Sequence, residues 1–215
     1  MQPAAFFRVE GTLLSKSSLM AAAWTAGNGQ QIRGRLARLG AVALAAPLAL
    51  RSKGAATQAS WSALRGTSED RLRVLGEEYW HSVLKKSTLP VGLRLLKQAQ
   101  DAGQRIVLIS DHPHCIAQHM TAALGAQSLL CNHLEVVDGE TTGALLKPII
   151  SGPLSGQWTR DWAIQHGIDL LASGGYGARG DDAVLLSAVG HPCAVRPDNA
   201  LRRTATDLSW PVVDA

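Results

Sequence analysis

Two short strings of charged residues stand close behind apolar runs, where a strand of an open sheet would end. The first brings Arg8 and Glu10 within three positions, and the second ends in the adjacent carboxylates Asp181 and Asp182. Ser110 closes a third apolar run. Carboxylates transfer protons, attack phosphorus or ligate a divalent cation, whereas guanidinium groups bind anions. The sequence therefore predicts a site for charged groups at one edge of a sheet.

The elements that must position these residues alternate between strand and helix. Residues 4–9 are an apolar strand followed by a Gly11-Thr12 turn, and residues 105–110 are a buried strand. The glycine-rich residues 174–180 are expected to form a flexible loop. The other expected elements are helices over 91–102, 117–124, 158–166, 181–189 and 199–206, strands over 170–173, 193–195 and 212–213, and a hairpin over 134–146. This order predicts a parallel sheet with crossover helices.

A helical segment follows the first strand. Residues 15–89 are rich in Ala, Leu, Arg and Trp and have few β-branched clusters. The segment Thr67-Ser68-Glu69-Asp70 offers an N-cap followed by acids in the first turn, and apolar residues then recur at helical spacing from Leu72 to Val83. We expect an all-α unit over residues 15–89, inserted into a core formed by residues 1–14 and 90–215.

The length, charge and cysteine content of the chain limit the classes of protein to which it can belong. A chain of 215 residues with 46% hydrophobic content can bury one substantial core, with room for a second small one. Its net charge of +4 is spread along the chain, which gives no basic stripe for nucleic acid. Three cysteines without a CxxC pair suit reduced thiols.

Targeting and membrane signals are absent from the pattern. Residues 1–10 have no basic region before their short apolar run, unlike a signal peptide, so we expect a cytoplasmic protein. The most apolar stretch, residues 39–50, is too short to cross a bilayer, which takes about 20 residues. It is expected to form a buried helical hairpin, with a contact to a membrane surface as the alternative. It could also serve as an interface with a second copy or a protein partner.

Four segments resemble, in order, the motifs of haloacid dehalogenase-like phosphatases. FFRVEGTLL (6–14) resembles FDxDGTL, the run ending at Ser110 resembles the second motif, and YGARGDD (176–182) with LLSAVGHP (185–192) resembles the fourth. CAVRPD (193–198) extends the likeness toward the subfamily related to phosphoserine phosphatase. The resemblance implies a Rossmann-like parallel sheet between helices, with a helical cap after the first strand.

Departures from the family pattern concern the reacting groups. By resemblance, the first aspartate of DxDGT attacks phosphorus and ligates magnesium, and the second protonates the leaving oxygen. Arg8 and Glu10 stand at these positions. A guanidinium stays protonated and offers no lone pair, so no aspartyl-phosphate can form at position 8. Glu10 keeps a carboxylic acid that could still donate a proton.

The metal site implied by the family is also reduced. In one alignment of the fourth motif, Ala178 replaces a ligating aspartate, Arg179 replaces the next serine, and Asp182 is the distal acid. A shifted alignment would restore Asp181 as a ligand. No lysine occupies the third motif, since the nearest, Lys147, lies on the hairpin side. We therefore expect no metal unless Asp181 and Asp182 retain magnesium.

Three hypotheses of function follow. The first is a phosphatase-like protein that is impaired or inactive and binds a small phosphorylated or anionic ligand through Arg8, Ser110 and Arg179. The second is an active phosphomonoester hydrolase that uses a non-standard carboxylate, Glu10 or Asp182. The third is a structural or interaction subunit that uses the apolar cap.

A histidine-rich segment is a separate candidate. Residues 111–115 read Asp-His-Pro-His-Cys, with His119 a turn later. Zinc needs about four ligands in a closed set, which this segment does not supply. A histidine near a bound anion and ordinary loop histidines are both compatible with the pattern.

Overall fold

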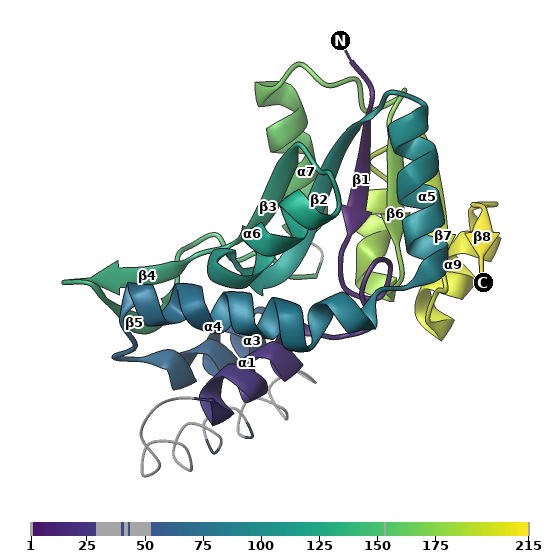
Figure 1. Cartoon of the computed structure of the whole chain (residues 1–215). Coiled ribbons are helices and arrows are strands. Elements are labelled where there is room, and N and C mark those ends of the chain that lie inside the picture. The colour runs from purple at the N-terminus through teal and green to yellow at the C-terminus, as the bar shows by residue number, and fades with distance from the viewer. Residues whose placement is uncertain (1, 29–39, 41–42, 44–52, 153, 215) are drawn as a thin grey trace.

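The computed structural model describes residues 2–28, 40, 43, 53–152 and 154–214 (Figure 1). Its centre is a six-stranded sheet with the order β3-β2-β1-β6-β7-β8. All neighbouring strands in it are parallel. The strands are β1 Ala4–Arg8, β2 Arg105–Pro113, β3 Ser128–Asn132, β6 Gly174–Gly177, β7 His191–Val195 and β8 Val212–Val213.

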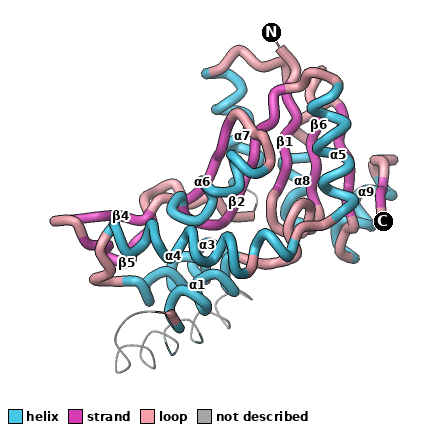
Figure 2. The backbone as a smooth tube through the Cα atoms, in the orientation of Figure 1, coloured by secondary structure: helices cyan, strands magenta, loops and turns pink. Residues whose placement is uncertain are grey.

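Helices cover both faces of this sheet (Figure 2). Side chains of a strand alternate between its faces, so Phe7 packs with α5 and α6 residues, whereas Phe6 packs with α7 and α8 residues. The helices are α5 Pro90–Asp101, α6 His114–Ala123, α7 Leu154–Gln165, α8 Ala183–Leu186 and α9 Asn199–Asp207. The predicted α/β fold is confirmed.

A second group of elements follows β1 and lies across the end of the sheet to which β1 points (Figure 1). It contains α1 Ser18–Gly27, α3 Lys53–Trp61, α4 Glu69–Ser82 and the short 3-10 helices η1 Ser62–Leu64 and η2 Leu84–Ser87. The N-cap predicted within Thr67-Ser68 is Ser68, which caps α4 by accepting a hydrogen bond from the Arg71 amide. The ideal Cβ of Gly76 would lie 1.8 Å from the Cys115 carbonyl oxygen, so a residue without a side chain lets α4 lie directly on α6.

The hairpin of β4 Leu134–Val137 and β5 Glu140–Leu145 joins this helical group. The Gly66 amide donates to the Thr141 carbonyl at 2.8 Å, and the Thr141 amide donates to the Thr67 carbonyl at 2.9 Å. The helical segment is thus hydrogen-bonded to a two-stranded hairpin that lies far from it in the sequence. The predicted apolar hairpin over 39–50 lies outside the described residues except at 40 and 43. Within the described part of the chain, no helix is both long and apolar enough to span a bilayer.

Three expectations about secondary structure were wrong. Residues 170–173 are not a strand; the strand is β6, within the segment that was expected to be a flexible loop. The ideal Cβ atoms of Gly175 and Gly177 would lie 2.7 Å from Val189 and Asp182 side-chain atoms, respectively. Glycines are therefore needed because residues 182–189 pack tightly on the strand. The helix expected over 181–189 is shorter, η3 Gly180–Asp182 followed by α8, and β3 was not anticipated.

Candidate active site

Four of the residues singled out from the sequence meet near the ends of three central strands: Arg8, Glu10, Ser110 and Asp182. Arg8 is the last residue of β1 and pairs with Ile109 of β2, so Ser110 lies one residue beyond that pair. On the other side, β6 ends at Gly177. The ideal Cβ of Gly11 would lie only 2.9 Å from the Ala178 methyl group, which places the turns after β1 and β6 in contact.

Arg8 is buried, and its guanidinium is held by acids. Its Nε donates to Asp182 Oδ1 at 2.9 Å, and its Nη2 donates to Asp111 Oδ1 at 2.8 Å. Nη2 also lies 3.7 Å from Glu10 Oε2. Burial alone would lower the pKa of Arg8, but the charges of Asp111, Asp182 and Glu10 raise it well above its usual value. Arg8 is therefore a permanent cation, and its guanidinium is paired with carboxylates of the same chain.

Glu10 is buried beside Arg8, and its hydrogen bonds to the described residues are all on one oxygen. Oε1 accepts from Ser110 Oγ at 2.6 Å and from the Asp111 amide at 3.0 Å. It also lies 2.6 Å from His112 Nδ1. Burial raises the pKa of Glu10, but the hydrogen bond and charge of His112, with Arg8 and Ser110, lower it to about 2. Glu10 is therefore held as a carboxylate.

Asp182 connects Arg8 to the turn after β6. Its Oδ2 accepts hydrogen bonds from the amides of Ala178 and Arg179, both at 2.9 Å, while Oδ1 accepts from Arg8. Asp181 is placed differently, because its Oδ2 lies 3.2 Å from the ideal Cβ of Gly152 in the loop before α7. Of the two adjacent acids, Asp182 therefore contacts the cation.

Sequence reasoning missed Asp111 and His112 as members of this cluster. Strand β2 continues three residues beyond Ser110, with a bulge between Ser110 and Pro113. His112 is consequently buried against Glu10 and is not a loop histidine. Burial raises the pKa of Asp111 above its usual range despite the nearby Arg8 charge. Polar residues such as Asp111 and His112 after an apolar run predict a loop, although they equally fit a strand that continues into a polar site.

The remaining candidates lie outside the buried cluster. Arg179 is partly exposed, and its Nε lies 3.9 Å from the ideal Cβ of Gly11. Lys147 is exposed on the segment after β5. His114 is exposed and stacks on His133, with ring centroids 5.1 Å apart.

The cluster does not fit a magnesium ion. Magnesium takes oxygen ligands at about 2.0–2.1 Å in an octahedral arrangement. Here Asp111 and Asp182 each direct one carboxylate oxygen at a guanidinium nitrogen, the second oxygen of Asp182 accepts from two backbone amides, and the side chain of Ala178 offers no ligating atom. Among the residues that the structure describes, no group of three or more His, Cys, Asp or Glu side chains could hold a metal ion.

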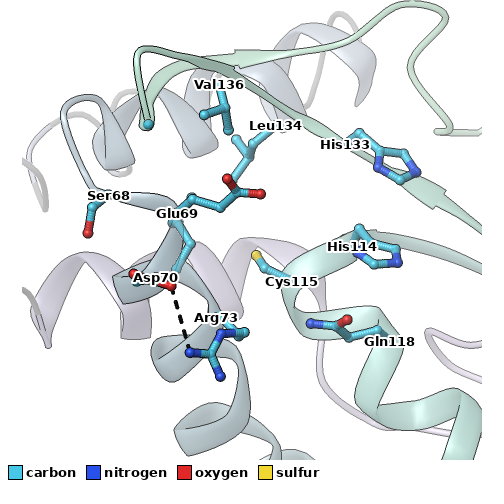
Figure 3. Close-up of a pocket in the computed structure, with 12 residues that line it drawn as sticks. Ser68, Glu69, Asp70, Arg73, His114, Cys115, Gln118, His133, Leu134 and Val136 are labelled. Atoms are coloured by element: carbon cyan, nitrogen blue, oxygen red, sulfur yellow. Dashed lines mark ion pairs between the residues drawn. The ribbon is translucent and has the colours of Figure 1, made fainter.

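A separate pocket of about 520 Å³ lies between α4, α6 and β4 (Figure 3). Figure 3 shows His114 and His133 facing each other at one side, with the Glu69 and Cys115 side chains between them and the Arg73–Asp70 ion pair. None of the buried cluster residues Arg8, Glu10, Ser110 and Asp182 lines this pocket.

Replacing Glu10 by glutamine is expected to change how stability depends on pH. Because the folded-state pKa of about 2 lies below the ordinary value of 4.5, ionised Glu10 stabilises the fold above pH 4.5, and this contribution disappears as the pH falls toward 2. The raised pKa of Asp111 acts in the opposite direction, and because the charge of Glu10 is one of its causes, Glu10→Gln should weaken this opposing effect. We expect the difference in unfolding free energy between wild type and Glu10→Gln to shrink with falling pH. Urea unfolding between pH 2.5 and 7 would measure it, with the exposed Glu78→Gln as control; parallel curves for wild type and Glu10→Gln would contradict the assignment.

Comparisons with known proteins show the family and the fold of the chain. A family model described as haloacid dehalogenase-like hydrolase matches residues 5–192. A phosphoserine phosphatase of Mycobacterium tuberculosis is 31% identical over 151 residues, which make up 70% of this chain and 49% of that protein. The chain spans about half the length of the first curated relatives it matches.

Solved structures share the fold. A crystal structure of a protein of unknown function from Bordetella pertussis superposes with a TM-score of 0.87 at 23% identity, covering 100% of this chain and 99% of that one. A phosphoserine phosphatase in its apo form superposes with a TM-score of 0.73 at 15% identity, covering 100% and 94%. At these identities the likeness shows the fold alone.

Proposed function

The chain belongs to the haloacid dehalogenase-like hydrolase family, and we propose that it is a phosphatase-like member that does not hydrolyse phosphomonoesters. The observation that carries this proposal is the position of Arg8, whose guanidinium bonds to Asp111 and Asp182 at the end of β1. By the family resemblance, this is where the attacking carboxylate and the metal would meet. A guanidinium can neither attack phosphorus nor ligate a cation.

The charge of Arg8 supports the proposal. Buried carboxylates need a compensating charge, since an unpaired buried charge is costly. Arg8 supplies it from within the chain, so Asp111 and Asp182 do not require a divalent ion for their burial. The contact of Asp182 with Arg8 also favours one of the two alignments of the fourth motif, the one in which Ala178 replaces the ligating aspartate.

An active hydrolase using another carboxylate is less well supported. Glu10 Oε1 already accepts three hydrogen bonds, and Asp182 accepts bonds from Arg8 and two backbone amides. Hydrogen bonds to the charged form stabilise a carboxylate and make it a poorer base and nucleophile. Either residue would have to give up these partners before reacting.

Binding of a small anionic ligand remains part of the proposal, with unequal contributions from the three predicted residues. Arg8 and Ser110 are already bonded to carboxylates of the chain. An anion could use them only by exchanging these bonds. Arg179 is partly exposed and is the residue of the three that solvent reaches. We expect any anion to contact Arg179 first.

Phosphate release tests the proposal. Wild-type protein would be incubated with an aryl phosphate and with phosphoserine, the substrate that relatives' names suggest, with and without magnesium. Loss of a nucleophile lowers turnover by on the order of a millionfold, so we expect no magnesium-dependent release. Magnesium-dependent release that Glu10→Ala or Asp182→Ala abolishes would contradict the proposal and favour the hydrolase with a non-standard carboxylate.

A further inference from the structure

We propose that Glu10 is a built-in anion, whose carboxylate occupies a buried cradle of hydrogen-bond donors that would otherwise accept a small external carboxylate or oxyanion. The inference rests on the proposed function, because a site that turned over substrate would have to leave this cradle open. It adds an autoinhibitory contact: the chain fills its own anion site. Three donors from the end of β2 form the cradle, namely the Ser110 hydroxyl, the Asp111 amide and the His112 imidazole.

The donors are arranged around a single oxygen and are fixed by their own contacts. The Ser110 oxygen accepts a hydrogen bond from the His112 amide at 3.1 Å, which leaves its hydrogen free to donate to Glu10 at 2.6 Å. With Glu10 as a carboxylate, which can only accept, the hydrogen between it and His112 Nδ1, 2.6 Å away, is assigned to Nδ1; the same nitrogen lies 3.2 Å from Ser110 Oγ. Ser110, His112 and Glu10 are all fully or almost fully buried. Such a set of preoriented donors favours negative charge wherever water is excluded.

The fit of Glu10 in this cradle is incomplete. Its second oxygen, Oε2, is buried and has no hydrogen-bond donor among the described residues. Arg8 Nη1 is likewise buried without an acceptor in the described part of the chain, and Arg8 Nη2 approaches Oε2 only to 3.7 Å. The side chain of Glu10 is tethered to the turn after β1, so it cannot move to satisfy both ends. An untethered anion would not be limited in this way.

The size of the ligand follows from the side chain that now fills the site. Replacing Glu10 by alanine removes one methylene and one carboxylate, which together correspond to acetate. The variant should therefore lose stability and bind acetate or formate in the vacated space. Larger oxyanions such as phosphate test how far the cradle can open.

The experiment measures thermal unfolding of the full chain in acetate, formate, phosphate and chloride at equal ionic strength. We expect Glu10→Ala to melt below wild type, and its melting temperature to rise saturably with acetate or formate but not with chloride. The wild type should show no such rise, nor should Asp101→Ala, which removes an exposed carboxylate. Adding Ser110→Ala to Glu10→Ala should weaken the response. An equal response of wild type and Glu10→Ala to acetate would overturn the proposal.

A measurement on the wild type covers the case in which Glu10→Ala does not fold. Nitrogen-15 spectra of the imidazoles should show His112 Nδ1 protonated and hydrogen-bonded, and Glu10→Gln should shift this signal. An unprotonated Nδ1 would overturn the cradle. Phosphate release by wild type would contradict the proposed function, whereas an inactive wild type without acetate rescue would contradict the cradle alone.

Discussion

Replacement of Arg8 by alanine is expected to lower the free energy of unfolding by about 3–5 kcal/mol, the usual cost of removing one partner from a buried ion pair. Asp182 and Asp111 would lose the guanidinium that now contacts them at 2.9 and 2.8 Å and would be left buried without a counter-charge. Urea unfolding at pH 7 would measure the change. The loss should be smaller at low pH, because burial raises the pKa of Asp111 and its protonated carboxyl group no longer needs a cation.

A matched control uses an arginine whose ion pair is on the surface. Arg202 contacts Asp214 with both side chains largely exposed, and exposed pairs contribute little. Arg202→Ala should leave the unfolding free energy nearly unchanged. If Arg8→Ala also left the unfolding free energy nearly unchanged, the acids around Arg8 would have to be neutral or hydrated. Arg8 would then not be their counter-charge.

The second large effect is expected from restoring carboxylates at both altered positions. Arg8→Asp combined with Ala178→Asp removes the resident cation and adds two oxygen ligands beside Asp182. Repulsion between these buried charges should make the metal-free variant much less stable than wild type. Magnesium should restore the stability by binding only the folded state. Phosphate release from an aryl phosphate should then rise by orders of magnitude over wild type.

The single variant Arg8→Asp is the control for this prediction. It restores the carboxylate at position 8 but leaves Ala178, whose methyl group cannot ligate a cation. We expect it to be unstable without gaining comparable magnesium affinity. If the single and double variants behaved alike, position 178 would not be a ligand position, and the shifted alignment with Asp181 would be favoured.

Much of the sheet could be predicted because its strands are apolar on both faces. The runs that became β1 and β2 are buried almost throughout, as a parallel sheet requires. Strand β6 could not be recognised, because its GGYG sequence lacks β-branched residues and reflects the close packing of Val189 and Asp182. Local propensity contains no information about that packing.

The positions of four cluster residues could be predicted, but their hydrogen bonds could not. Arg8, Glu10, Ser110 and Asp182 could be placed together from the rule that parallel strands end at one edge. Their bonding could not, since Arg8 and Asp182 are 174 residues apart in the chain, and Asp111 lies beyond the predicted end of its strand. The sequence predicted that Arg8, Glu10 and Asp182 would lie at one edge of the sheet, whereas the structure shows that Arg8 bonds to Asp182 and to Asp111.

Calorimetric titration of magnesium into the wild type, beside Arg8→Asp/Ala178→Asp, tests most directly whether Arg8 replaces the metal. We expect no saturable heat and no change in melting temperature for the wild type, with saturable binding by the double variant. Saturable binding of magnesium to the wild type, lost in Asp182→Ala, would contradict a site filled by Arg8.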